Sequence, residues 1–359
     1  MSENLKGRIV FLDYMRVFAF MSVMIGHKFY DDLIWMASSP EVHITLRALA
    51  QMLMPLCLGG AAGVVVFFLT SGYIITKVLA KEEPKEFLVK RVFRIYPLYM
   101  IAVVAEYLAG YWGYGLYPAS TKEVISRLLL VGDFNGTPNG LHGVEWTLRI
   151  EVLFYAFMAV LKYAGFFRTC RHLPAVYVVA LAGLYLSSPF PGAWTWTFAY
   201  VTVYAPLLIF GSLIMLAESH QEIRAKCIGL MTIIFVMFLI MSAKLVPGWK
   251  ESNYMAFGVM FFLGFWALRT KVAPNFAVSF LAELTFSVYL MHNWVWIYID
   301  MALSYFEVGT QFRQVQILII LFLICYGLNR YVEKTFNRIG AKLAKRRPAA
   351  PIGEPALYD

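Results

Sequence analysis

Three ionisable side chains interrupt the first apolar run of the sequence, where a hydrocarbon environment makes charge costly. The run covers about residues 9–30 and contains Asp13, Arg16 and His27. At about 100° per residue, Arg16 and His27 lie within about 20° of each other around a helix and roughly 16 Å apart along it, and Asp13 shares their face. An ion pair and an imidazole that can exchange a proton then occupy one helix face. A structural ion pair and an interfacial histidine would account for the same pattern.

Further ionisable groups lie in later apolar runs. Glu145 and Arg149 are spaced i,i+4 and can pair, whereas Glu151 has no partner on its own helix face. A carboxylate inside a membrane span favours a functional role, with an interhelical salt bridge as the alternative. His292 lies within a late apolar run, where proton transfer and hydrogen-bonded packing explain it equally well. Weaker candidates are Glu106 and Glu283.

Two arginines share a helix face in the basic stretch Lys-Arg-Val-Phe-Arg-Ile-Tyr-Pro. Arg91 and Arg94 are three residues apart, so that a helix presents both on one side. Two guanidinium groups in this arrangement suit phosphate. Ordinary positive charge on a cytoplasmic loop is the alternative.

The elements that position these residues follow from the composition. The chain has 359 residues, of which 60% are hydrophobic and 15% charged, and its mean hydropathy is +0.65. An average soluble domain is about 45–50% apolar and about 25% charged. The composition therefore excludes a disordered chain, a coiled coil and an ordinary soluble enzyme, and predicts an all-α, polytopic integral membrane protein. The four cysteines are scattered, which indicates neither a disulfide framework nor a metal site.

Ten apolar runs are predicted to span the membrane. They cover about residues 9–30, 58–80, 95–115, 145–165, 174–190, 194–217, 227–245, 254–270, 276–299 and 314–331. With the N-terminus inside, 22 of the 31 Lys and Arg residues fall in inner segments and seven in outer segments. This excess, and the net charge of +9, predict that both termini are cytoplasmic.

The segments between the spans carry fewer signals. We expect residues 48–57 to form a short re-entrant or interfacial helix, because they are apolar but end at a pair of glycines. The longest outer segment, 116–144, predicts a short helix near Lys122–Leu130 and then a turn-rich stretch. Residues 1–335 are predicted to form a single transmembrane domain. Residues 336–359 read as a basic, then Pro/Ala-rich, cytoplasmic tail, and no soluble domain is appended.

Five segments, taken in order, resemble the acyltransferase-3 family of integral-membrane acyltransferases. The first is Arg16-x10-His27 within Leu-Asp-Tyr-Met-Arg-Val, and the others are residues 63–76, 87–99, 145–155 and 287–292. They resemble the second helix, the Arg-x-x-Arg segment, the Trp-Ser-Leu-x-x-Glu segment and the Ser-x-Tyr-x-x-His segment of that family. Thr147 replaces the usual serine of the fourth segment but keeps a hydroxyl.

The resemblance implies an acyl-CoA-dependent acyltransferase of the bacterial cytoplasmic (inner) membrane. It implies transfer of an acyl group, most often acetyl from cytoplasmic acetyl-CoA, to a hydroxyl of a surface or exported glycan, such as an exopolysaccharide, lipopolysaccharide or a lipid-linked precursor. The chain resembles the stand-alone members that lack an SGNH hydrolase-like domain. The implied partners are acyl-CoA, the glycan and membrane lipid, with neither a metal nor nucleic acid.

The resemblance also implies roles for individual residues. His27 would be the general base on the acceptor hydroxyl or the site of a transient acyl group. Arg16, oriented by Asp13, would hold the donor or stabilise developing charge. Arg91 and Arg94 would bind the phosphates of CoA on the inner side.

The remaining implied residues belong to the acceptor and substrate side. Glu151 joins the catalytic set and, with Trp146, would shape the acceptor side, while His292 is a second proton carrier. The substrate-binding positions that the matching segments imply are Trp146, Ser71, His292 and Tyr289.

Two other classes of protein fit the same sequence features. A secondary transporter or a lipid-linked sugar flippase also has many spans and intramembrane charges, although no paired inverted halves are visible. A catalytically silent membrane scaffold is the third class. The residues specify neither the acceptor glycan nor the acyl chain length, the oligomeric state, or whether transfer is direct or through an acyl-enzyme.

Overall fold

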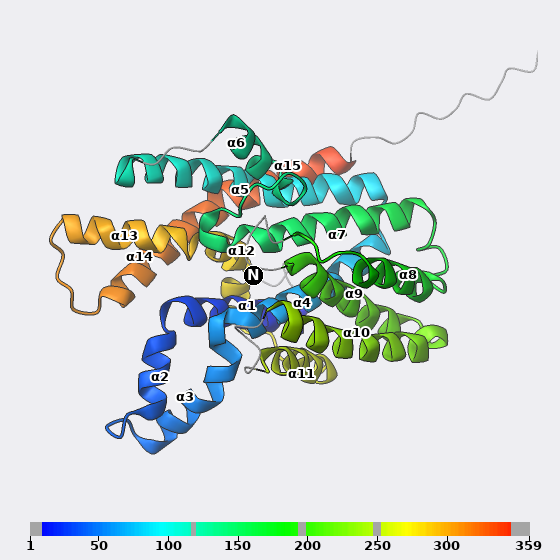
Figure 1. The fold of residues 1–359 in the computed structure, drawn as a ribbon, viewed down its shortest axis with the longest axis horizontal. Coiled ribbons are helices and arrows are strands. Elements are labelled where there is room, and N and C mark those ends of the chain that lie inside the picture. The colour runs from blue at the N-terminus through cyan, green and yellow to red at the C-terminus, as the bar shows by residue number, and fades with distance from the viewer. Residues whose placement is uncertain (1–8, 116–119, 193–198, 247–252, 346–359) are drawn as a thin grey trace, which may run out of the picture.

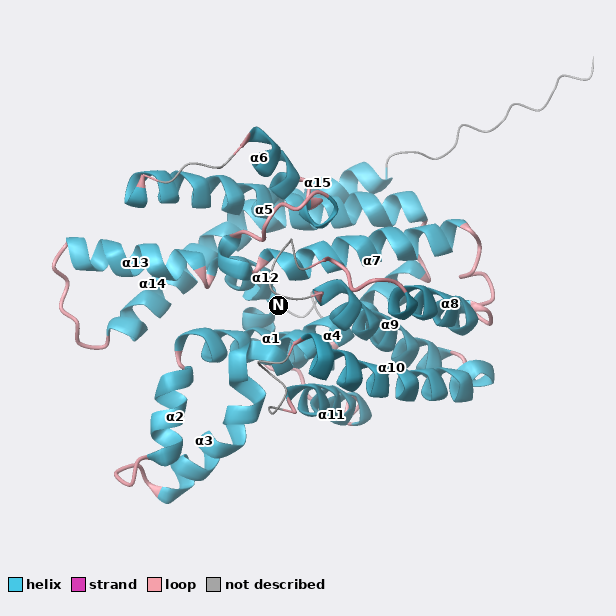
Figure 2. Cartoon of the chain, in the orientation of Figure 1, coloured by secondary structure: helices cyan, strands magenta, loops and turns pink. Residues whose placement is uncertain are grey.

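The computed structural model describes residues 9–115, 120–192, 199–246 and 253–345, and these residues form helices joined by turns, with no strand among them (Figures 1 and 2). The start of the span predicted at 194–217 and the end of the predicted tail lie outside these ranges. The helices are α1 Val10–Lys28, α2 Tyr30–Ser38, α3 Ile44–Cys57, α4 Ala61–Leu79, α5 Pro84–Tyr114, α6 Thr121–Leu128, α7 Glu145–Tyr163, α8 Leu173–Leu186, α9 Tyr200–Ser219, α10 Arg224–Leu245, α11 Tyr254–Ala267, α12 Phe276–Met291, α13 Trp294–Tyr305, α14 Arg313–Leu328 and α15 Lys334–Lys345.

The all-α membrane fold predicted from the composition is confirmed. Six helical stretches in the described part are long and apolar enough to cross a bilayer, and three shorter apolar helices accompany them. The long stretches are Val10–Lys28, Ile44–Leu79, Pro84–Tyr114, Tyr200–Ser219, Gln221–Leu245 and Arg313–Lys345. The count of ten spans and the cytoplasmic position of both termini stay predictions.

Helix α4 lies at the centre of the bundle, in contact with α1, α9 and α11. Two glycines let α4 and α9 approach closely. A Cβ atom on Gly72 of α4 would lie 2.0 Å from the carbonyl oxygen of Leu208, and one on Gly211 of α9 would lie 2.1 Å from that of Leu69. Only glycine allows the two backbones to approach this closely, so α4 and α9 form one packed unit against which α1 and α7 are set.

Two helical hairpins, α2–α3 and α13–α14, project from the same end of the bundle (Figure 1). The segment expected as a short helix at 48–57 is part of the longer α3, which pairs with α2. Gly59 and Gly60 then take positive φ values of 54° and 69° and separate α3 from α4. The α2–α3 hairpin has a small apolar core of its own, consisting of Leu33, Ala37, Ala50 and Cys57.

The prediction of one continuous span over 276–299 was wrong, because the helix breaks between α12 and α13. Two side chains take the carbonyls that a continuous helix would use. The Nδ1 atom of His292 lies 2.7 Å from the carbonyl oxygen of Tyr289, and the indole N–H of Trp294 donates to the carbonyl of Leu290 at 3.2 Å. The break therefore places His292 and Asn293 at a helix junction rather than in the middle of a span.

Helix α5 begins earlier than the predicted span at 95–115. Pro84 occupies its first turn, where the missing N–H of proline costs nothing, and the helix then continues through Pro97 to Tyr114. Arg91 and Arg94 are consequently helical and share a face, and they do not lie in the inner loop where the sequence placed them. At the other end of the chain, the π-helical turn Asn329–Glu333 joins α14 to α15, which packs along α5.

A buried ion network joins residues 120–144, within the predicted outer segment, to α7. Arg149 is 1% exposed and lies 2.7 Å from both Glu145 and Asp133, which confirms the predicted i,i+4 pair. Arg127 of α6, the short helix predicted in this segment, pairs with the same Glu145 at 3.2 Å and with Glu106. Burial alone would lower the pKa of the Arg127 guanidinium, but the two carboxylates raise it, so that its charge is retained.

We expect Arg149→Met to destabilise the protein strongly, because it leaves the carboxylates of Glu145 and Asp133 buried without their cation. Removing one partner of a buried ion pair costs about 3–5 kcal/mol. The measurement is thermal unfolding in detergent, with Arg168→Met, at an exposed position, as the control. Equal unfolding midpoints for the two variants would contradict the structural role assigned to this network.

Candidate functional site

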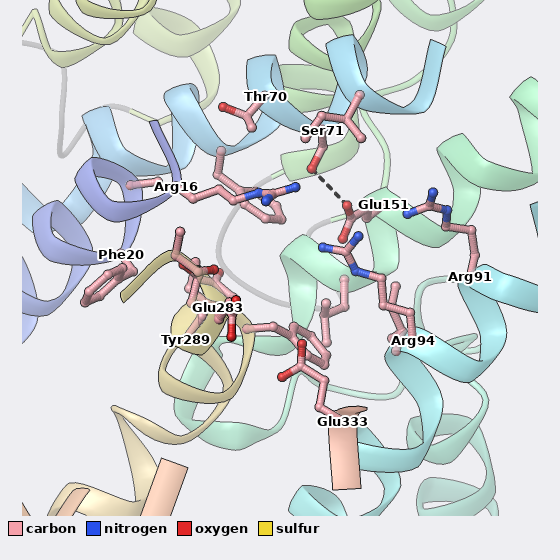
Figure 3. Close-up of a pocket in the computed structure, with 18 of the residues that line it drawn as sticks. Arg16, Phe20, Thr70, Ser71, Arg91, Arg94, Glu151, Glu283, Tyr289 and Glu333 are labelled. Atoms are coloured by element: carbon pink, nitrogen blue, oxygen red, sulfur yellow. Dashed lines mark hydrogen bonds between the residues drawn. The ribbon is translucent and has the colours of Figure 1, made fainter. Parts of the chain in front are cut away.

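A cavity of about 310 Å³ lies between α1, α4, α5, α7, α12 and the junction of α14 with α15. Its wall is mainly apolar on the sides of α1 and α4, apart from Arg16 of α1, and strongly charged elsewhere. Figure 3 shows Arg16, Ser71, Arg94 and Glu151 converging on its interior from four helices. The charged lining residues are Arg16, Arg91, Arg94, Lys334, Glu151, Glu283 and Glu333.

Two of the cations in this wall have no carboxylate partner. Neither Arg91 nor Arg94 lies within ion-pair distance of an acidic side chain in the part of the chain that the structure describes. The guanidinium of Arg91 lies over the rings of Phe87 and Tyr155, at 5.1 and 5.8 Å from their centroids, and its buried Nε has no hydrogen-bond partner. An unsatisfied guanidinium N–H inside a cavity is a donor that an anionic ligand can use.

The carboxylates of the cavity have neutral partners or a lysine at the rim. Glu151 accepts a hydrogen bond from Ser71 at 2.9 Å, so it has a partner on α4 that the sequence did not predict. Glu333 accepts from Ser287 and Asn329, both at 3.0 Å. Glu283, a weak candidate from the sequence, pairs with Lys334 at 2.7 Å.

Glu333 and Lys334 are the cavity residues that sequence reasoning missed. They follow the last predicted span, 314–331, and lie beyond the last motif, which ends at residue 292. The signal that could have found them is an acidic residue within the apolar-to-basic transition after residue 328. The π-helical turn Asn329–Glu333 directs the Glu333 carboxylate into the cavity, and such turns are frequent at functional sites.

The face predicted for the first helix extends from the cavity to a pair of histidines. Arg16 lines the cavity and donates to the buried Asp13 at 3.5 Å, as the spacing predicted. Along α1 the last residue that lines the cavity is Val23, and along α12 it is Tyr289. His27 lies four residues beyond Val23, and His292 lies three residues beyond Tyr289, so that each is about one helical turn further on.

His27 and His292 are hydrogen-bonded to each other. The Nδ1 atom of His27 lies 3.0 Å from the Nε2 atom of His292, with the rings nearly parallel at 22°. The Nδ1 atom of His292 lies 2.7 Å from the carbonyl oxygen of Tyr289, which can only accept. The neutral His292 therefore carries its proton on Nδ1 and accepts at Nε2, and His27 must donate from its own Nδ1.

This chain of donors leaves the Nε2 lone pair of the neutral His27 able to take a proton. His292 is 1% exposed and fixed, whereas the ring of His27 lies at an exposed position. The arrangement is that of a general base held in one tautomer by a second residue.

Tyr289 lies at the end of the cavity that is next to the histidine pair. Its ring lines the cavity and stacks on Phe67 at 5.8 Å, with 7° between the planes. Its hydroxyl lies 2.8 Å from Oγ1 of Thr147, so the threonine at this position uses its hydroxyl as a serine would. Its carbonyl fixes His292.

The structure brings together most of the predicted site residues but not all. Trp146 is 6% exposed and packs against Phe68, Tyr200 and Tyr204 rather than lining the cavity. The resemblance implied that Glu151 and Trp146 shape the acceptor side together. In the structure, Glu151 lines the cavity with Arg91 and Arg94, and Trp146 does not. Their shared motif places the two side chains on different faces of α7.

Comparison with known proteins gives one family and one curated relative. A family model described as an acyltransferase domain matches residues 9–330. The exopolysaccharide production protein ExoZ of Rhizobium meliloti (strain 1021) is 36% identical over 111 residues, covering 28% of this chain and 33% of that protein. The aligned segment thus spans about a third of the relative's length. No solved structure matches.

We expect nitrogen NMR of histidine-labelled protein in lipid at neutral pH to show His27 and His292 as Nδ1–H tautomers. The hydrogen-bond chain from His27 through His292 to the Tyr289 carbonyl requires both. Loss of the signals in His27→Gln and His292→Gln assigns them among the six histidines. An Nε2–H tautomer for His27 in the unaltered protein would contradict the deduced hydrogen-bond chain.

Proposed function

The chain belongs to the acyltransferase-3 family of membrane acyltransferases, and on this basis we propose that it is an O-acyltransferase that uses acyl-CoA, with acetyl-CoA as the first donor to test. The proposed acceptor is a hydroxyl of an exported glycan, and the name of the relative makes exopolysaccharide the first choice. The observation that carries the proposal is the His27–His292 pair, one helical turn beyond a cavity with two unpaired arginines.

The donor fits the charged part of the cavity. Acyl-CoA carries a pyrophosphate and a ribose phosphate, and it arrives from the cytoplasm. Arg91 and Arg94 lie in the second and third turns of α5, close to the loop that the Lys and Arg distribution predicts to be cytoplasmic. Their guanidinium groups match phosphate oxygens, and Arg91 supplies a buried N–H with no other partner. The thioester end of the donor then extends along α1 toward Tyr289 and His27.

The acceptor reaches His27 from the opposite end of the bundle, where its ring is exposed. As the acceptor oxygen bonds to the thioester carbonyl carbon, its proton passes to Nε2 of His27, and the carbonyl oxygen takes the negative charge. Collapse of this intermediate re-forms the carbonyl and breaks the C–S bond, and the departing CoA thiolate takes the proton from Nε2 of His27. His292 stabilises the transient imidazolium by accepting from its Nδ1–H.

This role explains why the histidines form a pair at a helix break. A single histidine on α1 would be free to change tautomer and orientation. The junction between α12 and α13 supplies a second ring that is buried and fixed by a backbone carbonyl. Membership of an acyltransferase family favours this reading over a transporter or flippase. Integral location in the bacterial inner membrane follows as part of the proposal.

We expect His27→Gln to lower CoA release from acetyl-CoA by about 10²–10⁴-fold, the usual contribution of a general base. The assay uses purified protein in nanodiscs, radiolabelled acetyl-CoA and a glycan extract. The matched control is His220→Gln, at a histidine paired with the exposed Glu222 and distant in sequence from the site.

Each other outcome of this assay has a defined meaning. No turnover by well-folded unaltered protein with any acyl-CoA would overturn the proposed function. Turnover that survives in His27→Gln would remove the general base from the mechanism. Label retained on the protein without acceptor would replace direct transfer with a covalent acyl-enzyme.

We expect Arg91→Gln and Arg94→Gln to raise the KM for acetyl-CoA by about 10-fold or more each, with a smaller change in kcat. A hydrogen bond to a charged group is worth about 1.5–3 kcal/mol, and 1.4 kcal/mol corresponds to tenfold. The control is Lys85→Gln, at an exposed lysine on the same helix. An equal KM increase in the control would mean that only the general positive charge of this surface matters.

A further inference from the structure

The residues next to the two histidines form a second contact between the same helices. Lys28 follows His27 at the end of α1, and Asn293 follows His292 at the break between α12 and α13. The ammonium of Lys28 donates to Oδ1 of Asn293 at 2.8 Å and reaches its carbonyl at 3.4 Å. It also lies 5.7 Å from the centre of the Trp296 ring. A cation is thereby fixed beside the proposed base.

Lys28 carries its charge without a compensating carboxylate. Its hydrogen-bond partners are amide and carbonyl oxygens, and in the described ranges no acidic side chain lies within ion-pair distance of it. Asp31 and Asp32, one turn away on α2, are exposed and make no such pair. An ammonium that is partly removed from water without a counter-ion is costly, which points to a negative charge that arrives during function.

We propose that Lys28 is a further catalytic residue, whose ammonium donates a hydrogen bond to the oxyanion that forms from the thioester carbonyl. This inference rests on the proposed acyltransferase activity. When the acceptor oxygen bonds to the carbonyl carbon, His27 receives the hydroxyl proton and the carbonyl oxygen becomes negative beside Lys28. When the C–S bond breaks, that oxygen returns to a carbonyl and the hydrogen bond weakens.

The hydrogen-bond partner of Lys28, Asn293, is itself held in place by a second contact. Asn293 is itself fixed, because its Nδ2 donates to the carbonyl of His142 at 2.6 Å. Leu141, His142 and Gly143 hold that carbonyl with three successive positive φ values, of 52°, 50° and 86°. A donor that is oriented before the charge develops needs no reorganisation in the transition state.

The alternative role for a lysine at the end of a spanning helix is contact with lipid phosphates alone. Lys244, in the last turn of α10, occupies such a position, because its side chain is exposed and it makes no polar contact with another helix among the described residues. Lys28 differs because it contacts Asn293 of another helix. Lys244 is therefore the matched control for position and charge.

The test is steady-state kinetics of Lys28→Gln in nanodiscs, with acetyl-CoA and the glycan extract. Loss of one oxyanion donor lowers kcat by about 10²–10³-fold. We expect that fall with the KM for acetyl-CoA changed less than about twofold, partial recovery in Lys28→Arg and no change in Lys244→Gln. An unchanged kcat in Lys28→Gln would overturn the inference. A raised KM for the acceptor alone would also overturn it and assign Lys28 to an anionic group of the acceptor.

Two variants of Asn293 separate charge from structure. Both Asn293→Asp and Asn293→Ala lose the contact with the His142 carbonyl, but only Asn293→Asp gives Lys28 a carboxylate partner. If Lys28 acts through its charge, Asn293→Asp is the slower enzyme, because the new ion pair competes with the oxyanion. If the contact only joins two helices, Asn293→Asp is the faster one, and the inference is wrong. Inactive unaltered protein would instead overturn the proposed function, and this inference with it.

Discussion

Charge buried in an apolar helical bundle must be satisfied from within the protein, and this constraint separates the structural ions of this chain from the functional ones. Arg149 has two carboxylates and no exposed surface, and it fastens a segment of chain. Arg91 and Lys28 are partly buried, yet each contacts only rings or neutral oxygens. Because the cost of an uncompensated cation is large, we propose that ligands or reaction intermediates bring the missing charge to these incomplete sites.

Much of this arrangement follows from local sequence rules. The 3.6-residue period placed Asp13, Arg16 and His27 on one face, and i,i+4 spacing paired Glu145 with Arg149. The short helix α6 was also predictable, since Ser120 accepts from the backbone N–H of Glu123 at its start. These features depend on residues within one or two turns of each other, which a single sequence contains in full.

The parts that escaped prediction depend on distant segments. His27 and His292 are 265 positions apart, and neither spacing nor composition specifies that their helices meet. The break after α12 depends on side chains that capture carbonyls, which apolar patterning does not reveal. Glu333 lines the cavity because a π-helical turn at the end of an apolar run directs its side chain there. Trp146 does not line the cavity, because a motif places residues near each other in sequence without giving their side chains a common direction.

Each histidine lies at the base of a projecting hairpin: α2–α3 follows His27, and α13–α14 follows His292 (Figure 1). The first hairpin is built around its own four-residue apolar core, apart from the main core of the bundle. Changes in length or sequence at its tip can therefore accumulate without disturbing the packing of α1, α4 and α9. The consequence is evolutionary: the surface that this hairpin presents beside His27 can diverge while the packing of the helices that carry the histidine pair stays the same.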